Sequence, residues 1–99
     1  MEVTITGDWE EKSILINDNS LSPESSLRLI KYNDAGHFQW GYSGTAVLQL
    51  ALAILLEYTD EVTAIDLHMR FMKDHLEPLH ESDFILDIDI NRWIKENDN

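Results

Sequence analysis

The first forty residues carry short runs in which apolar and polar side chains alternate, and turn-forming residues separate these runs. Alternation of this kind is typical of strands that bury one face. Short polar side chains and glycine predict turns at residues 18–20 and 33–36, and Pro23 predicts a loop. Between these breaks the pattern predicts four strands, over residues 2–6, 13–17, 27–32 and 37–41.

The pattern then changes to helical spacing. Residues 45–58 are rich in leucine and alanine, and their apolar positions extend nearly all the way around a helix, which predicts a central buried helix. Residues 60–77 predict a second helix, which Pro78 ends. A short strand over residues 84–87 and a last helix over residues 88–97 follow. The second helix has its apolar positions three or four residues apart on one stripe: Val62, Ile65, Met69, Met72, Leu76 and Leu79.

Predicted strands and helices are therefore segregated along the chain. This order favours an α+β fold with about four antiparallel strands, then a buried αα-hairpin, then a short β–α tail. The 99 residues contain no internal repeat and no linker rich in Pro, Gly or Ser, and this length suits one domain. We therefore expect residues 1–99 to form a single domain.

Charge is the most unusual property of the composition. The chain holds 19 acidic residues against 7 Lys and Arg, a formal net charge of −12. The acids are concentrated in residues 1–24, with a net charge of −5, and in residues 57–83, with a net charge of −6, whereas residues 25–56 carry +1. Such a surface repels phosphates and anionic lipids, so we expect no direct contact with nucleic acid and no membrane docking. It favours basic partners.

Patterns that carry chemistry are scarce in this sequence. It contains no cysteine, which excludes disulfides, thiolate catalysis and iron–sulfur ligation. It also contains no nucleophile elbow, phosphate-binding loop or dinucleotide fingerprint. His68 and His75 would lie about 10 Å apart along a helix, too far to share a metal ion without a third ligand. We therefore expect no catalytic residue, no metal and no cofactor, and we predict that the protein is not an enzyme.

The expected location follows from the apolar segments. The first five residues have neither the basic nor the apolar region of a secretory signal. The longest apolar stretch, residues 46–56, contains Gln49 and is too short to span a bilayer. We therefore expect a cytoplasmic protein.

Two sequence runs resemble a known family. Residues 38–44, Phe-Gln-Trp-Gly-Tyr-Ser-Gly, and residues 49–55, Gln-Leu-Ala-Leu-Ala-Ile-Leu, are similar to a small uncharacterised domain family of bacteria, plasmids and phages. The pattern of that family is aromatic-x-Trp-Gly-Tyr-Gly-Gly-Ser-Gly-Pro, followed by Gln-Leu-Ala-Leu-Ala-Ile/Leu-Leu. This chain departs from it at Ala46-Val47, where the family tends to have Gly-Pro. The resemblance implies a fold and a mobile-element context, with the host cytoplasm as the location, but no catalytic residue.

Charge and resemblance together predict a non-catalytic protein-binding module. In this hypothesis a phage or mobile element encodes the protein. Its acidic surface inhibits a host defence nuclease, or another nucleic-acid-binding protein, by engaging its basic groove, as nucleic-acid-mimicking anti-CRISPR proteins do. Trp9 either anchors the partner or folds back onto the sheet, and the sequence leaves both open. The predicted contact residues form two acidic clusters: Asp8, Trp9, Glu10, Glu11, Glu57, Asp60, Glu61 and Asp66.

Two alternatives remain open. The chain could bind a small molecule such as a nucleotide signal, because a glycine-containing turn that opens on a helix N-terminus can hold an anion. It could instead be a structural subunit whose acidity gives only solubility. The residues of the small-molecule alternative are Gly41, Ser43, Gly44 and Thr45.

Overall fold

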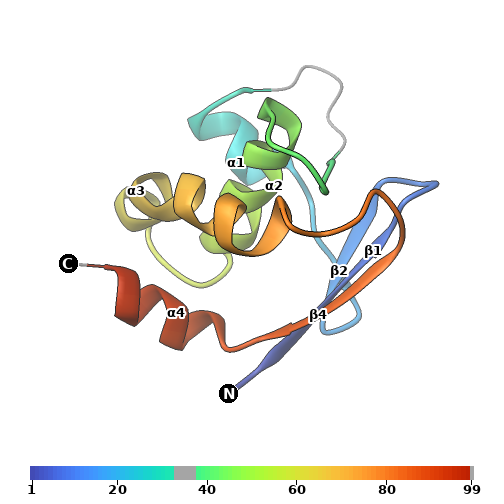
Figure 1. Ribbon diagram of the computed structural model, residues 1–99. Helices are drawn as coiled ribbons and strands as arrows, with labels where there is room; N and C mark the ends of the chain where they lie inside the picture. Colours follow the sequence, from blue (N-terminus) through green and yellow to red (C-terminus); the bar gives the residue numbers. More distant parts are fainter. Residues whose placement is uncertain (33–37, 99) are drawn as a thin grey trace.

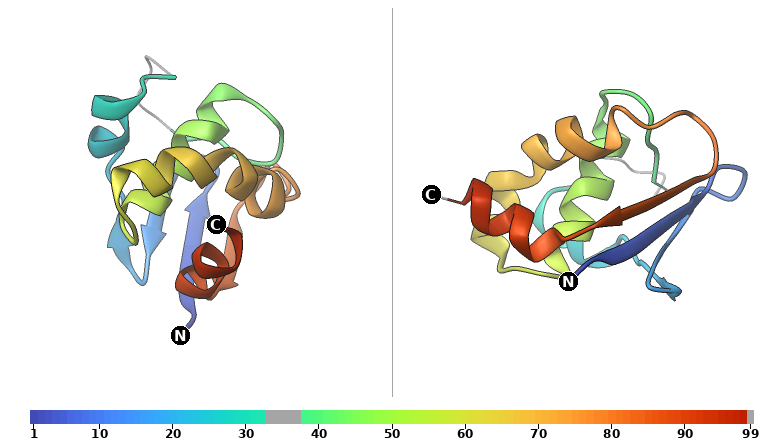
Figure 2. Two further views of the ribbon diagram at one scale, coloured as in Figure 1. Left: turned by 90° about the vertical axis from the view of Figure 1, so that its left-hand side faces the viewer. Right: turned by 60° about the horizontal axis from the view of Figure 1, so that its bottom comes forward.

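The computed structural model describes residues 1–32 and 38–98, and Figure 1 shows a sheet with the helices gathered on one side of it. Figure 2 shows the same separation between sheet and helices from two other directions. In chain order the elements are β1 (Val3–Asp8), β2 (Ser13–Ile16), β3 (Asn19–Ser20), α1 (Glu24–Leu29), α2 (Thr45–Leu56), α3 (Glu61–Phe71), the π-helical turn η1 (Met72–Leu76), β4 (Phe84–Ile88) and α4 (Ile90–Asn97).

The sheet is antiparallel, and its four strands lie in the order β3-β2-β1-β4. The last strand along the chain therefore pairs with the first. Successive side chains of a strand point to opposite faces of the sheet. Ile5, which lies opposite Ile16 and Leu86, faces the helices and is completely buried. The core thus lies between one face of the sheet and the helices.

Helix α2 passes through the centre of this core, which confirms the predicted central helix. It packs against α3, and the two form the predicted αα-hairpin. β4 and α4 form the predicted β–α tail, so the α+β class is also confirmed. The apolar side chains of α2 are buried on every side of the helix: Ala46, Val47, Leu50, Ala51, Leu52, Ala53, Ile54 and Leu55.

Residues 27–32 do not form the predicted strand, because a helix begins upstream of them. Helix α1 occupies residues 24–29, with Pro23 at its N-cap position. The fixed φ of proline suits the start of a helix, and the dipole favours Glu24 in the first turn. The Ser26 hydroxyl also donates to the Pro23 carbonyl at 2.8 Å. These local contacts outweigh the short alternation that predicted a strand.

The strand predicted over residues 37–41 is absent from residues 38–41. The remaining residue of that strand and the turn predicted at residues 33–36 lie outside the described residues. Phe38 and Trp40 are nonetheless buried, and Gln39 between them is half-buried. Both edges of β1 are already paired, with β2 and β4, so this segment packs on the core without joining β1.

The hairpin between β2 and β3 turns earlier than predicted. Asn17 and Asp18 have positive φ angles of 49° and 68°. Both central residues of a type I′ hairpin turn require positive φ, and Asn and Asp tolerate it well. Asn19 and Ser20, which were predicted as turn residues, therefore pair with β2 as the short strand β3.

Helix α3 continues directly into η1, and together they occupy the predicted second helix. The first half of the predicted apolar stripe is wrong, because Val62, Ile65 and Met69 are 78%, 41% and 52% exposed. Its later positions Met72 and Leu76 are buried. A π-helical turn holds an extra residue, so side chains after it are rotated by about 100° relative to a continuous α-helix. The residues that α3 buries instead are Ala64, Leu67, His68 and Phe71.

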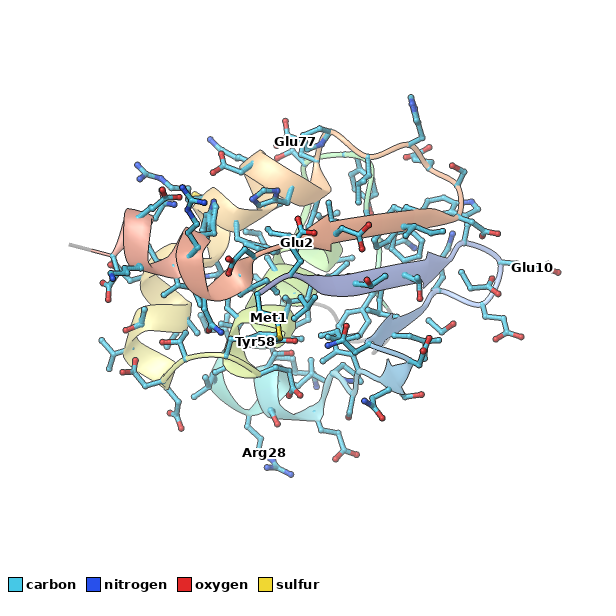
Figure 3. The ribbon with its side chains drawn as sticks, turned by 90° about the horizontal axis from the view of Figure 1, so that it is seen from below. Met1, Glu2, Glu10, Arg28, Tyr58 and Glu77 are labelled. Atoms are coloured by element: carbon cyan, nitrogen blue, oxygen red, sulfur yellow. The ribbon has the colours of Figure 1, made fainter. Side chains whose placement is uncertain are left out.

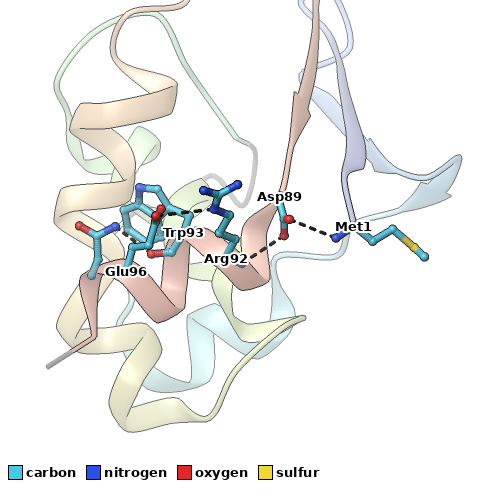
Figure 4. A network of polar contacts seen from close by, with 6 residues as sticks. Met1, Asp89, Arg92, Trp93 and Glu96 are labelled. Atoms are coloured by element: carbon cyan, nitrogen blue, oxygen red, sulfur yellow. Dashed lines mark hydrogen bonds and ion pairs between the residues drawn. The ribbon is translucent and has the colours of Figure 1, made fainter.

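Helix α4 begins at an aspartate cap (Figure 4). The Asp89 carboxylate accepts a hydrogen bond from the Arg92 backbone N–H at 3.1 Å, and it lies 3.1 Å from the amino group of Met1. These two interactions lower the pKa of Asp89. The helix starts at Ile90 rather than at the predicted residue 88, because Ile88 is still paired with β1 in the sheet.

Candidate functional site

The face of the sheet that points away from the helices is open (Figure 3). Thr6 on β1 lies opposite both Leu15 on β2 and Ile85 on β4, so these side chains form a row across this face. Ile85 is 75% exposed and Leu15 is half-buried. Beside the row, the Thr4 hydroxyl donates to the Asp87 carboxylate at 2.6 Å. The open face is therefore a short apolar row with polar groups around it.

A hollow of about 650 Å³ lies on this face beside the β1–β2 turn. The apolar row supplies part of its lining, and the carboxylates of Asp8, Glu11 and Asp83 supply another part. Asp83 accepts a hydrogen bond from the Trp9 backbone N–H at 2.8 Å, and Asp8 accepts one from the Glu11 N–H at 3.1 Å. These bonds hold acidic side chains from distant parts of the chain at the same rim of the hollow.

Most of the net charge belongs to the sheet and the turns that join it. Residues 1–20 and 81–89 contain nine acidic residues and one basic residue, which gives −8 of the total −12. Glu2 and Glu10, labelled in Figure 3, lie in this part of the molecule. The basic residue, Lys12, has its ammonium group 2.9 Å from the centre of the Trp9 ring. The sheet is therefore the acidic pole of the molecule.

Sequence reasoning identified only part of this pole. Asp8, Glu10 and Glu11 were predicted, whereas Asp83 and Asp87 were not. Pairing of β4 with β1 brings Asp83 beside the end of β1 at Asp8 and places Asp87 opposite Thr4, farther along the sheet. The available signal was the alternation from residue 84 to residue 88, which indicated a strand without indicating its neighbour.

Trp9 is half-buried at the edge of the core. Its ring meets the ring of Trp40 edge-on, with 5.3 Å between the centroids, and Lys12 covers it. Trp40 in turn packs edge-on against Phe84 at 5.0 Å. Trp9 therefore folds back onto the sheet, one of the two arrangements left open by the sequence, and a role in binding stays a prediction.

The second predicted cluster lies elsewhere. It belongs to the α2–α3 connection, which Figure 1 shows far from the β1–β2 turn, so the structure does not bring the two clusters together. Glu57 is the C-cap residue of α2. Asp60 caps α3 by accepting the Thr63 N–H at 2.8 Å, and this bond lowers its pKa. Glu61 lies in the first turn of α3, and Asp66 is exposed in the middle of that helix.

The turn proposed for a small molecule is tightly packed. Gly41 has a φ of +86°, and its N–H donates to the Leu76 carbonyl at 2.9 Å. A Cβ atom there would lie 2.9 Å from the Glu81 backbone nitrogen, and one at Gly44 would lie 2.6 Å from the Tyr42 ring. Both glycines thus permit close contacts within the chain. Ligand binding by Ser43 and Thr45 stays a prediction.

The histidines on α3 and η1 make contacts with the protein itself. His68 is buried, with its Nε2 2.9 Å from the Tyr32 hydroxyl and its Nδ1 2.6 Å from the Ile65 carbonyl. The His75 ring lies against Phe71 at 5.1 Å between centroids. Within residues 1–32 and 38–98, no group of three or more His, Asp or Glu side chains is placed to hold a metal ion.

Comparison with known families places the chain. A family model covers residues 6–96, and it describes a family of unknown function, DUF6166. The chain belongs to this family. The match agrees with the sequence resemblance at the level of an uncharacterised domain. No curated protein matches the chain, and no solved structure matches it.

Within residues 1–32 and 38–98, each helix is too short or too polar to cross a bilayer. The buried helix α2, for example, has 12 residues, whereas a span needs about 20.

The burial of His75 makes the stability of the protein depend on pH. Its Nε2 atom is buried and has no hydrogen-bond partner among residues 1–32 and 38–98, and the ring lies 5.8 Å from the Trp93 ring. Burial lowers the pKa of His75 below its ordinary value, although the neighbouring Asp74 acts in the opposite direction. Protonation is therefore easier in the unfolded chain, so the stabilisation from neutral His75 is lost as the pH falls below about 6.5.

We expect His75→Phe to reduce this acid sensitivity, because phenylalanine fills the aromatic site without titrating. The measurement is the difference in melting temperature between about pH 7.5 and about pH 5.5, a window in which unperturbed carboxylates stay ionised. His80→Gln, at an exposed histidine, is the matched control and should behave like the wild type. Equal acid sensitivity in the wild type and His75→Phe would contradict the assignment.

Proposed function

We propose that this chain is a non-catalytic protein-binding module, and that the open, acidic face of its sheet engages a basic surface on a partner protein. The observation that carries the proposal is the charge distribution: residues 1–20 and 81–89 hold −8, while the rest of the chain holds −4. Charge of one sign gathered on one face accelerates encounter with a partner of opposite charge.

The shape of this face supports the same function. The apolar row formed by Thr6, Leu15 and Ile85 lies beside the carboxylates of Asp8 and Asp83, and none of the helices in the described part of the chain covers it. Protein interfaces typically combine an apolar centre with a polar rim. Lysine and arginine side chains of a partner would suit this arrangement, because their aliphatic stems pack on apolar groups while their charged ends reach carboxylates.

The finer proposal concerns the class of partner. Nucleic-acid-binding grooves are lined with lysine and arginine, so an acidic protein face competes with the phosphates of the natural ligand. We propose a nucleic-acid-binding protein as the partner, and a defence nuclease if a phage or mobile element encodes this chain. The mobile-element setting rests on the sequence resemblance alone.

A charge-reversal pair tests the binding face. Glu2, Glu10 and Glu11 are exposed and belong to the acidic pole. Changing all three to lysine should lower the association rate with the partner by about tenfold or more. The matched control changes Glu24, Glu96 and Asp98 to lysine; these residues are also exposed, lie on the helical side, and shift the net charge by the same amount. The control should retain most of the association rate.

The measurement begins with capture of binding proteins from the host at low salt. Kinetics with the purified partner then follow at low and high salt, and a melting curve of each variant confirms folding. Affinity should fall as salt rises, because screening weakens exposed charge interactions. A partner that binds both triple variants equally well would contradict the assignment to the sheet face, and binding that is insensitive to salt would contradict an electrostatic mechanism.

A further inference from the structure

Helix α3 has two apolar faces, and the fold buries only one of them. The inward face includes Ala64, which is completely buried, and Leu67, which is 5% exposed. Val62, Ile65 and Met69 form a second stripe, of which Val62 is 78% exposed and Met69 52%. Residues three, four and seven apart lie on the same side of a helix, so this stripe runs for about 10 Å along α3. We call Val62, Ile65 and Met69 the outer stripe.

The outer stripe lies beside a hollow formed by the end of α3 and the start of η1. Asp66, Met69, Arg70, Lys73 and Asp74 line this hollow, whose volume is about 380 Å³. The helix therefore carries a protruding apolar side chain, Val62, near its N-terminal end and a receiving hollow about two turns later. Such a pair is self-complementary under two-fold symmetry, because each copy offers the group that the other accepts.

The charges on α3 indicate which occupant fits. Residues 60–74, which include the α3 cap and the hollow, contain four acidic and two basic residues, a net charge of −2, whereas residues 1–20 and 81–89 carry −8. Two copies of so acidic a protein repel one another most strongly through the sheet, and α3 is an element where they approach with less repulsion. A positively charged partner protein would instead bind the acidic sheet.

The order of these charges also sets the orientation. The acids Glu61 and Asp66 precede the bases Arg70 and Lys73 along the helix. In an antiparallel pair with Val62 beside Met69, Glu61 of each helix lies beside Arg70 of the other, whereas a parallel pair would put like charges together. Antiparallel packing also aligns the two helix dipoles favourably.

We propose that two copies of this chain associate through α3, antiparallel, with Val62 of each copy seated in the hollow beside Met69 of the other. This interface is small compared with the roughly 800 Å² that each partner buries in a standard complex, so the dimer is weak and depends on concentration. α3 and the open face of the sheet lie on different sides of the molecule (Figures 1 and 2). The dimer thus leaves both acidic faces accessible.

The first test is sedimentation velocity of the full chain over a wide concentration range. The wild type should shift from monomer to dimer as concentration rises. Val62→Thr with Met69→Gln keeps the charge and removes apolar contact, and it should raise the dissociation constant by at least about tenfold. Ile85→Thr is the matched control, because Ile85 is 75% exposed on the sheet, and it should dimerise like the wild type.

The second test addresses orientation. A variant with Glu61→Lys and Asp66→Lys has a wholly basic outer face on α3, and a variant with Arg70→Glu and Lys73→Glu has a wholly acidic one. Neither should associate with itself, but an equimolar mixture should form a heterodimer. Melting curves identify any variant that fails to fold. The more conservative variant with Glu61→Gln and Lys73→Gln then replaces it, and its self-association should be weaker than that of the wild type.

Three results would overturn the proposal. The wild type could stay monomeric at every concentration. The dimer could survive Val62→Thr with Met69→Gln, or be lost in Ile85→Thr, which would place the contact on the sheet. The charge-reversed variants, both folded, could fail to associate when mixed, which would exclude antiparallel pairing of α3. A dimer that depends on the outer stripe, together with the mixed heterodimer, would establish it.

Discussion

Replacing Leu52 with alanine should lower the free energy of unfolding by about 2–5 kcal/mol, as is typical of Leu→Ala changes in protein cores. Leu52 is completely buried in the middle of α2. Apolar side chains are buried on every side of this helix, so the lost methyl groups leave a cavity between the sheet and the other helices. Urea unfolding monitored by circular dichroism measures the change in the free energy of unfolding.

Leu48→Ala on the same helix is the matched control. It removes the same atoms and changes helix propensity equally, but Leu48 is only half-buried. Its cost should be less than half that of Leu52→Ala, at about 1–2 kcal/mol. Equal costs for the two variants would show that α2 is not the centre of the core.

The sequence predicted those elements in which the apolar pattern alone determines which faces are buried. Residues 45–58 are apolar around the whole helix, so no packing arrangement could leave them at the surface, and α2 is found within these bounds. The alternation in residues 2–6 and 13–17 predicted β1 and β2 for a similar reason, because each needs one apolar face covered.

Elements that depend on their neighbours were missed. Residues 27–32 alternate, but the start of a helix at Pro23 determines their structure. Phe38 and Trp40 also alternate with polar residues, yet Trp40 is held by contacts of its side chain, which packs on Phe84 and donates its indole N–H to the Ser82 carbonyl. The outer stripe on α3 was expected to be buried, and the π-helical turn η1 changes the face that follows it. Periodicity alone does not show how a neighbouring element changes the structure or burial of a segment.

The candidate site shows the same limit. The acids near residue 9 were identified from composition, but their association with Asp83 depends on a hydrogen bond from the Trp9 backbone N–H to the Asp83 carboxylate, 74 positions apart. Local charge counts cannot predict that contact. The same counts suggested one acidic surface formed by two clusters, whereas the structure separates them onto the sheet and the α2–α3 connection. Charge therefore identified the kind of surface, and strand pairing determined its members.

Gln49→Leu should destabilise the protein, although it places a more apolar residue of similar size in the core. Gln49 is 2% exposed on α2. Its amide nitrogen donates to the Ser26 hydroxyl at 2.8 Å and to the Ile30 carbonyl at 3.0 Å, and its amide oxygen accepts the Tyr32 N–H at 2.8 Å. This one side chain therefore ties α1 and the segment after it to the central helix.

Leucine makes none of these bonds, and each buried polar group left without a partner costs about 1–3 kcal/mol. The expected loss in urea unfolding is about 2–4 kcal/mol, because better burial of leucine offsets part of the cost. Ser26→Ala and Gln49→Leu each remove the same bond between Gln49 and the Ser26 hydroxyl, so the double variant should be more stable than the sum of the two single changes predicts. Hydrogen exchange should accelerate first in residues 26–32, since these lose their connection to α2 while the contacts between α2 and the sheet persist. If Gln49→Leu instead matches or exceeds the wild type in stability, the three hydrogen bonds do not hold α1 in place, and docking of this segment must rest on its apolar contacts.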